Sequence, residues 1–196
     1  KLTTVAAKIA ETSISVIDFG AKGDGTTDDT ASIQAALDFV AGKNRSVYLP
    51  FRERGYRVTR LVVPSRVRLW SDVTGYFKQG GWNPKSGTGQ VTWLKSSGPV
   101  NTPTITMHSG STVEGLLLVE PRQKFILKQE DEPFNDTQYA IQLGDESSIG
   151  KVVVGVTIRD VGFLGHNKFI VQYKTNNGKV PVIANRYIQR IHGAVF

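Results

Sequence analysis

The sequence predicts an all-β fold that begins with one α-helix, and three observations support this prediction. Apolar residues at helical spacing occur clearly once, between residues 28 and 41. From residue 46 onward, short runs rich in β-branched and aromatic residues recur between clusters of Gly, Pro, Asn and Ser, which is the pattern of strands and turns. Because no further helix separates these runs, a doubly wound α/β sheet is excluded.

The composition is that of a globular chain with a basic surface. Of the 196 residues, 39% are hydrophobic, which is enough for a buried core, and the absence of cysteine excludes disulfides and thiolate sites. The 24 basic and 17 acidic side chains give a net charge of +7. Because the basic residues are scattered, we interpret them as a solvated surface and expect no nucleic-acid partner. No run reaches the roughly 18 consecutive apolar residues of a membrane span, and no signal peptide is recognisable, so no membrane insertion is expected.

The first 45 residues predict three segments. Residues 1–13 are polar and rich in Ala and Thr, and we expect an arm or linker there. The run SVIDF at residues 15–19 predicts a short strand, and residues 20–27 predict a loop of turns. Together with the helix that follows, residues 14–45 form a strand–loop–helix unit ahead of the remaining strands.

The helix is expected to begin after Thr27 and to end before Gly42. Thr27 is suitable as the N-cap, and Asp28 and Asp29 place negative charge in the first turn, where the helix dipole favours it. Gly42 can adopt the left-handed conformation that ends many helices. One face of the helix is apolar, and its residues are Ile33, Ala36, Leu37 and Val40.

Residues 46–196 contain the predicted strands, which polar insertions interrupt at residues 75–90 and 128–137. The clearest runs are SVYLP (46–50), YRVTRLVV (56–63), RVRLW (66–70), VTWLK (91–95), TVEGLLLV (112–119) and VVVGVTIRDVGFLG (152–165). Asn177–Gly178 is the one candidate for a tight two-residue hairpin. The residues alone leave two arrangements open, an antiparallel sandwich or barrel and a parallel β-solenoid.

One segment carries a specific resemblance to a known family. The run VIDFGAKGDGTTDDTASIQAALDFV at residues 16–40, together with the strands that follow it, resembles the opening of the pectate-lyase-superfamily β-helix proteins. In particular, it is similar to phage tailspikes and capsule depolymerases. The resemblance is strong over residues 14–70 and loose over residues 91–165.

The resemblance implies a right-handed parallel β-helix with an N-terminal capping α-helix near residues 28–41. Such a cap is physically reasonable because the end of a stack of coils exposes unpaired backbone and apolar core. Residues 46–196 would form the coils, and only about four can be assembled at a repeat of roughly 20–50 residues. We therefore expect the chain to be a truncated fragment, the N-terminal part of a longer β-helix that is incomplete at the C-terminus.

The same resemblance implies a function. The parent protein is expected to bind, and to degrade by hydrolase or lyase chemistry, a bacterial surface polysaccharide of the capsular or lipopolysaccharide type. It is expected to be a homotrimer in the tail of a virion and to act outside the cell, and this chain alone is expected to be inactive. Two alternatives stay open: a secreted enzyme similar to pectate lyases or polygalacturonases, and a non-catalytic adhesion module of a virion.

The glycine-rich and acidic motifs are interpreted as structural. GAKGDG at residues 20–25 fits neither the Rossmann nor the P-loop pattern, and DGTTDDT at residues 24–30 lacks the EF-hand spacing. His108, His166 and His192 are far apart in the sequence. We therefore expect no metal and no cofactor.

Aromatic side chains are the best candidates for sugar recognition, because the C–H faces of sugars stack on rings. In the glycine-rich insertion, Tyr76 and Trp82 are the predicted substrate-binding residues, whereas Trp70 and Trp93 are expected to lie in strands and fill the core. Cleavage needs two carboxyl groups, or a base and a cation. Spacing identifies no converging pair, so the catalytic residues stay unassigned. The resemblance implies that Asp160, in the run TIRDVGF, is a turn residue between strands. The carboxylates on or beside predicted strands are Asp72, Glu114, Glu120, Asp145 and Asp160.

Overall fold

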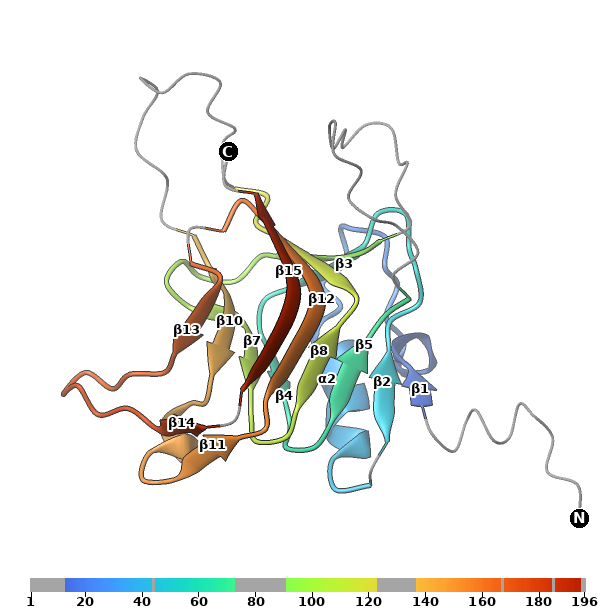
Figure 1. The fold of residues 1–196 in the computed structure, drawn as a ribbon. Coiled ribbons are helices and arrows are strands. Elements are labelled where there is room, and N and C mark those ends of the chain that lie inside the picture. The colour runs from blue at the N-terminus through green and yellow to red at the C-terminus, as the bar shows by residue number, and fades with distance from the viewer. Residues whose placement is uncertain are drawn as a thin grey trace, which may run out of the picture.

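The structure is a computed structural model that describes residues 13–43, 45–72, 91–122, 137–166, 168–184 and 186–194. The arm expected over residues 1–13 and the insertions at residues 75–90 and 128–137 lie almost wholly outside these ranges. In the described ranges the chain forms mostly strands, and they are arranged in parallel sheets with one α-helix (Figure 1).

Successive strands run around a coil, and each coil adds strands to the sheets of the coil before it. The first row of strands is β1 (Ser13–Ser15), β2 (Ser46–Tyr48), β5 (Arg68–Trp70), β8 (Thr112–Glu114), β12 (Thr157–Leu164) and β15 (Tyr187–Ala194). The second row is β3 (Tyr56–Val58), β6 (Thr92–Ser96) and β9 (Leu116–Val119), which pairs with the second half of β12. The third row is β4 (Leu61–Val63), β7 (Pro103–Met107), β10 (Tyr139–Leu143) and β13 (Ile170–Gln172). A short sheet joins β11 (Val152–Val154) to β14 (Val182–Ala184).

Every strand pair among the described residues is parallel, which decides between the two arrangements left open by the sequence. The turn at Asn177–Gly178 forms, with Gly178 at a φ of 85°. It is not a hairpin, because the strands on its two sides, β13 and β14, pair with different neighbours, β10 and β11. The antiparallel alternative is therefore wrong, and the strands are stacked as in a parallel β-helix.

The core lies inside the coils and is built by the alternation of side chains along each strand. Val47, Leu69 and Val113 are the central residues of β2, β5 and β8, and Ile158 is the second residue of β12. The four are paired in register and are fully buried. Because side chains alternate between the two faces of a strand, the residues on either side of these four point outward. Each coil thus contributes one apolar layer to the core and presents the alternate side chains on the outer face of the sheet.

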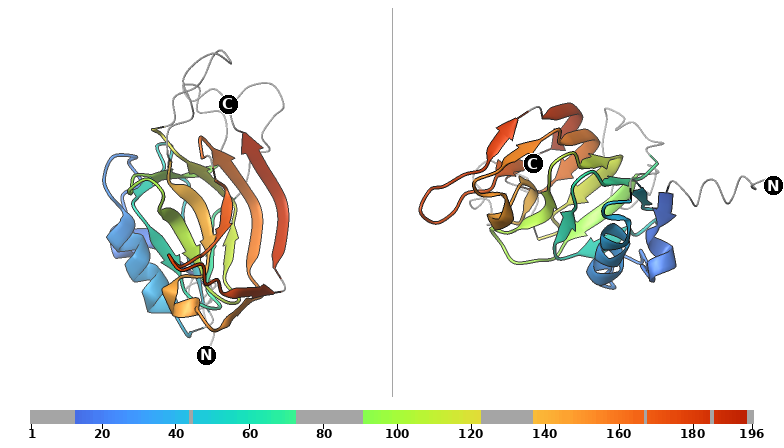
Figure 2. Two further views of the ribbon diagram at one scale, coloured as in Figure 1. Left: turned by 90° about the vertical axis from the view of Figure 1, so that its left-hand side faces the viewer. Right: turned by 90° about the horizontal axis from the view of Figure 1, so that it is seen from below.

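Helix α2 (Thr30–Val40) lies at the β1–β2 end of the stack and packs on β2 and β4 (Figure 2). The predicted stripe of Ile33, Ala36, Leu37 and Val40 is fully buried and belongs to the same core cluster as the strands. Gly42 is left-handed, as predicted, with a φ of 73°.

Two predicted boundaries at this end of the chain are wrong. Thr27 is not the N-cap, because its hydroxyl donates to Asp24 and the helix begins two residues later, after Asp29. The strand predicted at residues 15–19 ends at Ser15, and residues Val16–Phe19 form a 3-10 turn, η1. The Ser15 hydroxyl accepts the Ile17 N–H at 3.2 Å, and this bond favours a turn over an extended strand.

Asp160 is a bend residue, although it lies within one strand rather than in the turn between strands that the resemblance implied. It lies in the left-handed region, with a φ of 52°, in the middle of β12, where the strand passes from the first row to the second. Gly115 occupies the same bend one coil earlier with a φ of 73°, and its N–H donates to the Arg159 carbonyl at 3.2 Å. Aspartate tolerates this conformation better than most residues, so it can stand where the preceding coil has glycine.

A buried polar network lies where the second row of strands meets the third. The Glu120 carboxylate is fully buried and accepts two bonds from the Arg122 guanidinium, at 2.7 Å from Nε and 2.6 Å from Nη2, and one from the Gln138 N–H at 3.0 Å. Buried His166 lies 2.9 Å, through Nδ1, from the Gln138 carbonyl, and its Nε2 lies 3.5 Å from the Ser96 hydroxyl. Because its polar groups have partners, this network fits inside an apolar core.

Candidate functional site

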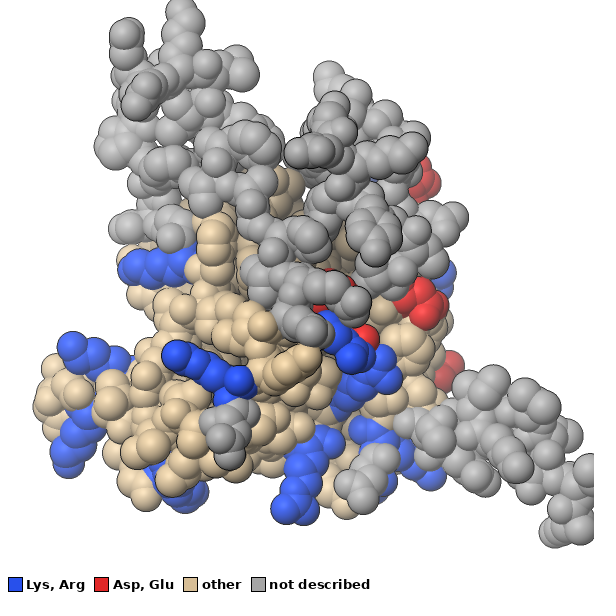
Figure 3. Space-filling model, viewed as in Figure 1, with Lys and Arg blue, Asp and Glu red and all other residues tan. Residues whose placement is uncertain are grey.

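The outer face of the first row of strands brings together aromatic and charged side chains from four coils. Tyr48, Trp70, Glu114 and Arg159 are paired in register on β2, β5, β8 and β12, and Arg68 lies two residues before Trp70 on the same side of β5. We call these five residues the aromatic–arginine face. Their inward neighbours fill the core, so alternation places all five on the outside. In Figure 3, basic and acidic side chains lie side by side over this part of the sheet.

The aromatic half of the face is a pair of rings in contact, which we call the platform. The rings of Tyr48 and Trp70 have their centroids 4.7 Å apart and are tilted by 40°. The guanidinium of Arg68 lies 4.7 Å from the Trp70 ring, a cation–π geometry. The Trp70 indole N–H donates to the Ser13 hydroxyl at 3.3 Å, which fixes the edge of the ring.

The charged half is one carboxylate held between two arginines. One oxygen of Glu114 accepts from Arg68, at 2.9 Å from Nε and 2.8 Å from Nη2, and the other accepts from Arg159, at 3.0 Å from Nε and also from Nη2. The Glu114 side chain is only 14% exposed, whereas those of Arg68 and Arg159 are 42% and 38% exposed. The carboxylate therefore orients two guanidinium groups whose remaining N–H donors reach solvent.

Tyr48 is held at the edge of the platform by a hydrogen bond that its hydroxyl donates to the Asp72 carboxylate. Burial, together with this hydrogen bond and the negative charge of Asp72, raises the pKa of Tyr48 to about 12. The phenol thus stays protonated near neutral pH and keeps its orientation.

The other candidate carboxylates are committed to structure. Glu120 is buried under Arg122, and burial would raise its pKa, but hydrogen bonds from Arg122 and Gln138 outweigh burial and lower it. Asp145 caps the 3-10 turn η2 (Glu146–Ser148) and pairs with His108 at 3.0 Å. Although burial opposes it, hydrogen bonds from Ser147 and the nearby His108 lower the pKa of Asp145.

These positions identify no general acid or nucleophile, because Glu114 has both oxygens in ion pairs and Asp160 serves the bend in β12. Within the described ranges, no three His, Asp or Glu side chains gather as a set of metal ligands. None of the helices in those ranges is long and apolar enough to cross a membrane. The arrangement is suited to binding through stacking and hydrogen bonds.

The predicted substrate-binding residues Tyr76 and Trp82 lie outside the described residues. The expectation that Trp70 and Trp93 fill the main core is wrong, because both lie at outward positions of their strands and are only half-buried. Trp93 packs instead against a separate small cluster on the outer side of β6 and β9.

The sequence reasoning also missed Tyr48, Arg68 and Arg159 as members of a site. Period-2 alternation around Val47, Leu69 and Ile158 was the signal that could have placed them outside. What the sequence did not contain was the register, because insertions of different length separate strands that are neighbours in the stack.

The match to a known family covers nearly all of these strands. Residues 13–174 match the family described as rhamnogalacturonase A/epimerase, pectate lyase-like. The chain belongs to this family. The pectate lyase-like segment includes every strand of the aromatic–arginine face.

Relatives of this pectate lyase-like chain include, by their names, a phage depolymerase specific for capsule types and an epimerase of mannuronan. Depolymerase 1 of Klebsiella phage K5-2, specific for capsule K30/K69, is 40% identical over 73 residues, which are 37% of this chain and 9% of the depolymerase. Mannuronan C5-epimerase AlgE5 of Azotobacter vinelandii is 56% identical over 52 residues, which are 26% of this chain and 5% of the epimerase. The matches thus span less than a tenth of the length of these relatives.

Two solved structures share the fold. The Dettilon tailspike protein (gp208) superposes with a TM-score of 0.52 at 16% identity and covers 96% of this chain and 30% of the tailspike. ORF18 of Geobacillus virus E2 superposes with a TM-score of 0.50 at 19% identity and covers 84% of this chain and 29% of that protein. With the family match and the phage depolymerase, these findings confirm the resemblance to tailspikes and depolymerases of the β-helix type.

Proposed function

We propose that this chain is the N-terminal β-helix part of a phage tailspike-like depolymerase and that its aromatic–arginine face binds a bacterial surface polysaccharide. The observation that carries the proposal is the row in which the contacting, tilted rings of Tyr48 and Trp70 continue into two guanidinium groups held by Glu114. The capsule depolymerase and the tailspike among its relatives support this class of ligand.

Each half of the face matches a feature of a polysaccharide. An aromatic ring stacks on the C–H face of a sugar, and a guanidinium donates several hydrogen bonds to hydroxyl or carboxylate oxygens. The row runs across neighbouring strands, from Tyr48 on β2 to Arg159 on β12, which is roughly 14 Å at about 4.8 Å per strand. A glycan chain is therefore expected to lie along the stack of coils rather than around it.

Degradation is proposed for the parent protein and not for this face. Both oxygens of Glu114 are in ion pairs, so it is a positioning residue for Arg68 and Arg159 rather than an acid or base. The carboxyl pair of a hydrolase, or the base of a lyase, would then lie on further coils.

The proposed architecture is a right-handed β-helix in which residues 14–45 cap one end and further coils continue from the other. The buried stripe of α2 supports the cap. At the opposite end, Ile188 on β15 is paired in register with the fully buried Ile158, yet it is 41% exposed. One more coil would cover it as β15 covers β12. From its resemblance to phage tailspikes, the parent protein is further proposed to be a homotrimer in a virion tail, where it meets polysaccharide outside the host cell.

Binding of the purified chain to capsular polysaccharides and lipopolysaccharide O-chains tests the proposal. The variants Trp70→Ala and Arg159→Met are each expected to weaken binding by about tenfold, equivalent to ~1.4 kcal/mol. Phe51→Ala is the matched control, because Phe51 is an exposed aromatic residue outside the face. Thermal melting of each variant verifies that it is folded. Equal binding by all four proteins, or binding of none of the glycans by the wild type, would overturn the assignment of this face.

A further inference from the structure

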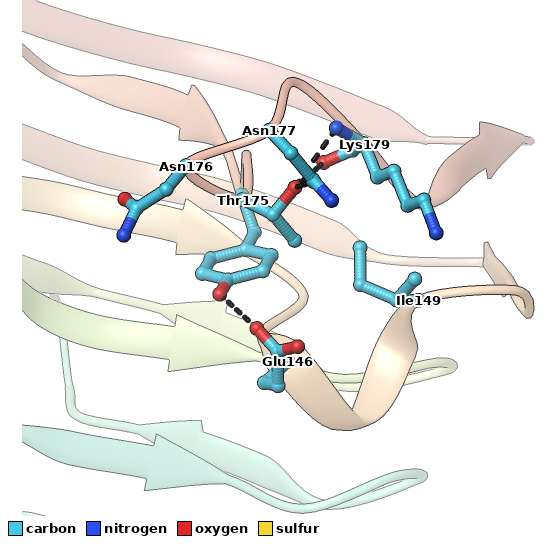
Figure 4. Close-up of a pocket in the computed structure, with 7 residues that line it drawn as sticks. Glu146, Ile149, Thr175, Asn176, Asn177 and Lys179 are labelled. Atoms are coloured by element: carbon cyan, nitrogen blue, oxygen red, sulfur yellow. Dashed lines mark hydrogen bonds between the residues drawn. The ribbon is translucent and has the colours of Figure 1, made fainter.

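An open hollow lies on a different part of the molecule, between η2 and the loop that joins β13 to β14. It has a volume of about 420 Å³, which is within the range of small-molecule sites. Its lining residues are Glu146, Ile149, Tyr173, Thr175, Asn176, Asn177 and Lys179. Figure 4 shows Asn176, Asn177 and Lys179 on the loop, opposite Glu146 and Ile149.

The loop that carries the polar side chains is braced by its own hydrogen bonds. The Thr175 N–H donates to the Lys179 carbonyl at 2.9 Å, and the Lys179 N–H donates to the Thr175 hydroxyl at 2.8 Å. Gly178, at a φ of 85°, makes the tight turn possible, and its N–H donates to the Thr175 carbonyl at 3.0 Å. The amides and the ammonium are therefore presented from a preformed scaffold, which reduces the entropy lost when a ligand binds.

The floor of the hollow combines an apolar part with a fixed carboxylate. The Tyr173 hydroxyl donates to Glu146, and this hydrogen bond, with burial and the charge of Glu146, raises the pKa of the phenol. The phenol stays neutral near physiological pH, and the Glu146 oxygen that it does not occupy can accept from a ligand. Ile149 and the tyrosine ring supply the apolar contact.

The chemistry of this lining fits an uncharged sugar. The Asn177 side-chain oxygen accepts from the Thr175 hydroxyl, so Asn177 offers mainly its NH2 donors, whereas the Asn176 amide can both donate and accept; together they suit adjacent hydroxyl groups. The lining carries one carboxylate, on Glu146, and one ammonium, on Lys179, so the two charges cancel and an anionic ligand gains nothing overall. A uronate or a phosphate, in contrast, would need a surplus of cationic donors.

We propose that this hollow is a second carbohydrate site, separate from the aromatic–arginine face, that binds a neutral hexose unit. The inference rests on the proposed function, because a second sugar contact serves a chain that binds polysaccharide. Two contacts on one glycan raise the overall affinity through effective concentration.

Nuclear magnetic resonance titration of the folded chain tests the proposal, with D-glucose, D-galactose, D-mannose and D-glucuronate as probes. The amide signals of residues 173–179 are expected to shift with at least one hexose and not with glucuronate. In the variants Asn176→Ala and Lys179→Met, the shifts are expected to shrink at least about fivefold at equal sugar concentration. Lys174→Met is the control, since Lys174 is a neighbouring exposed lysine that does not line the hollow.

The outcomes separate this inference from the proposed function. Shifts that occur with glucuronate alone, shifts that survive in both variants, or no shifts with any probe would each overturn the neutral-sugar site. The polysaccharide binding lost in Trp70→Ala is measured on whole glycans and reports on the other face. If that binding is unaffected by Trp70→Ala while the hexose shifts occur, the proposed face fails and the hollow stands.

Discussion

The most informative perturbation of the fold is Arg122→Met, because it removes one partner of a buried ion pair. The Glu120 carboxylate is fully buried, while the Arg122 side chain is 39% exposed. Without the guanidinium, the carboxylate keeps only the backbone N–H donors of residues 122 and 138, at 3.1 and 3.0 Å. The Gly98 carbonyl also loses the donor that Arg122 provides at 2.7 Å.

The expected cost follows from these contacts. Breaking a buried ion pair by removing one partner costs about 3–5 kcal/mol. The two backbone donors that remain place this case near the lower limit, so we expect the free energy of unfolding to fall by about 3 kcal/mol. For a chain of this size, that corresponds to a Tm lower by roughly 6–12 °C.

The pH dependence distinguishes an uncompensated charge from lost packing. In the wild type, burial opposes but the hydrogen bonds prevail, so the pKa of Glu120 is lowered on folding. Its stabilisation is therefore present above the pKa of the unfolded chain, near 4.3, and is lost as pH falls through the folded value. In Arg122→Met, burial dominates and the carboxyl takes up a proton more readily, so the deficit relative to wild type should shrink between pH 7 and pH 4.

Chemical denaturation of four proteins provides the assay: wild type, Arg122→Met, the double variant Glu120→Gln/Arg122→Met, and Arg54→Met as an exposed-arginine control. The double variant should be more stable at pH 7 than Arg122→Met alone, because an amide at position 120 carries no buried charge. If Arg122→Met loses less than about 1 kcal/mol of unfolding free energy relative to the wild type, or if that loss is independent of pH, the reasoning is refuted.

Three further predictions concern stability. Burial lowers the pKa of His166, so below the unfolded pKa of about 6.5 unfolding takes up a proton and stability falls, by at most ~1.4 kcal/mol per pH unit. In His166→Asn, a plot of Tm against pH should therefore be flatter between pH 6.5 and pH 5 than in the wild type. An unchanged slope would contradict this. Gly55→Ala should lower the unfolding free energy by well over the ~1–2 kcal/mol that a left-handed residue costs, since the new Cβ would lie 2.6 Å from that of Trp93. Gly42→Ala is the control, because its Cβ meets open space and only the left-handed cost applies. Equal losses of unfolding free energy in denaturant titration would be evidence against the packing at Gly55. Phe163→Ala should lower the unfolding free energy by ~3–5 kcal/mol, because the ring is 1% exposed in the core, and a loss under 1 kcal/mol would show that the coil is not packed as described.

Some of this protein was predictable from the sequence because its signals are local. The helical stripe from Ile33 to Val40 and the left-handed Gly42 depend on residues within a few positions of one another, and the structure confirms both. The order of elements, one helix followed by strands, excluded a doubly wound sheet by itself. The bend at Asp160 was implied by the family resemblance of the run TIRDVGF.

Other features were decided by the tertiary structure. Thr27 has the chemistry of an N-cap, whose hydroxyl would accept a backbone N–H of the first helical turn. In the structure its hydroxyl donates to the Asp24 carboxylate instead, and the sequence does not show which of these two partners is preferred. Trp70 looks like a core residue by its hydrophobicity alone. Its outward direction follows from the phase of alternation around Leu69, and its neighbour Tyr48 comes from the coil before.

The sequence by itself determined the family resemblance, the order of one helix followed by strands, and the apolar face of the helix, since each depends on contiguous residues. The resemblance implied parallel strands, but only the tertiary structure established their pairing and placed Trp70, Glu114 and Arg159 in one row. The physical reason is that register between coils depends on backbone pairing across insertions of unequal length. Such pairing is a long-range property, and no local pattern of residues encodes it.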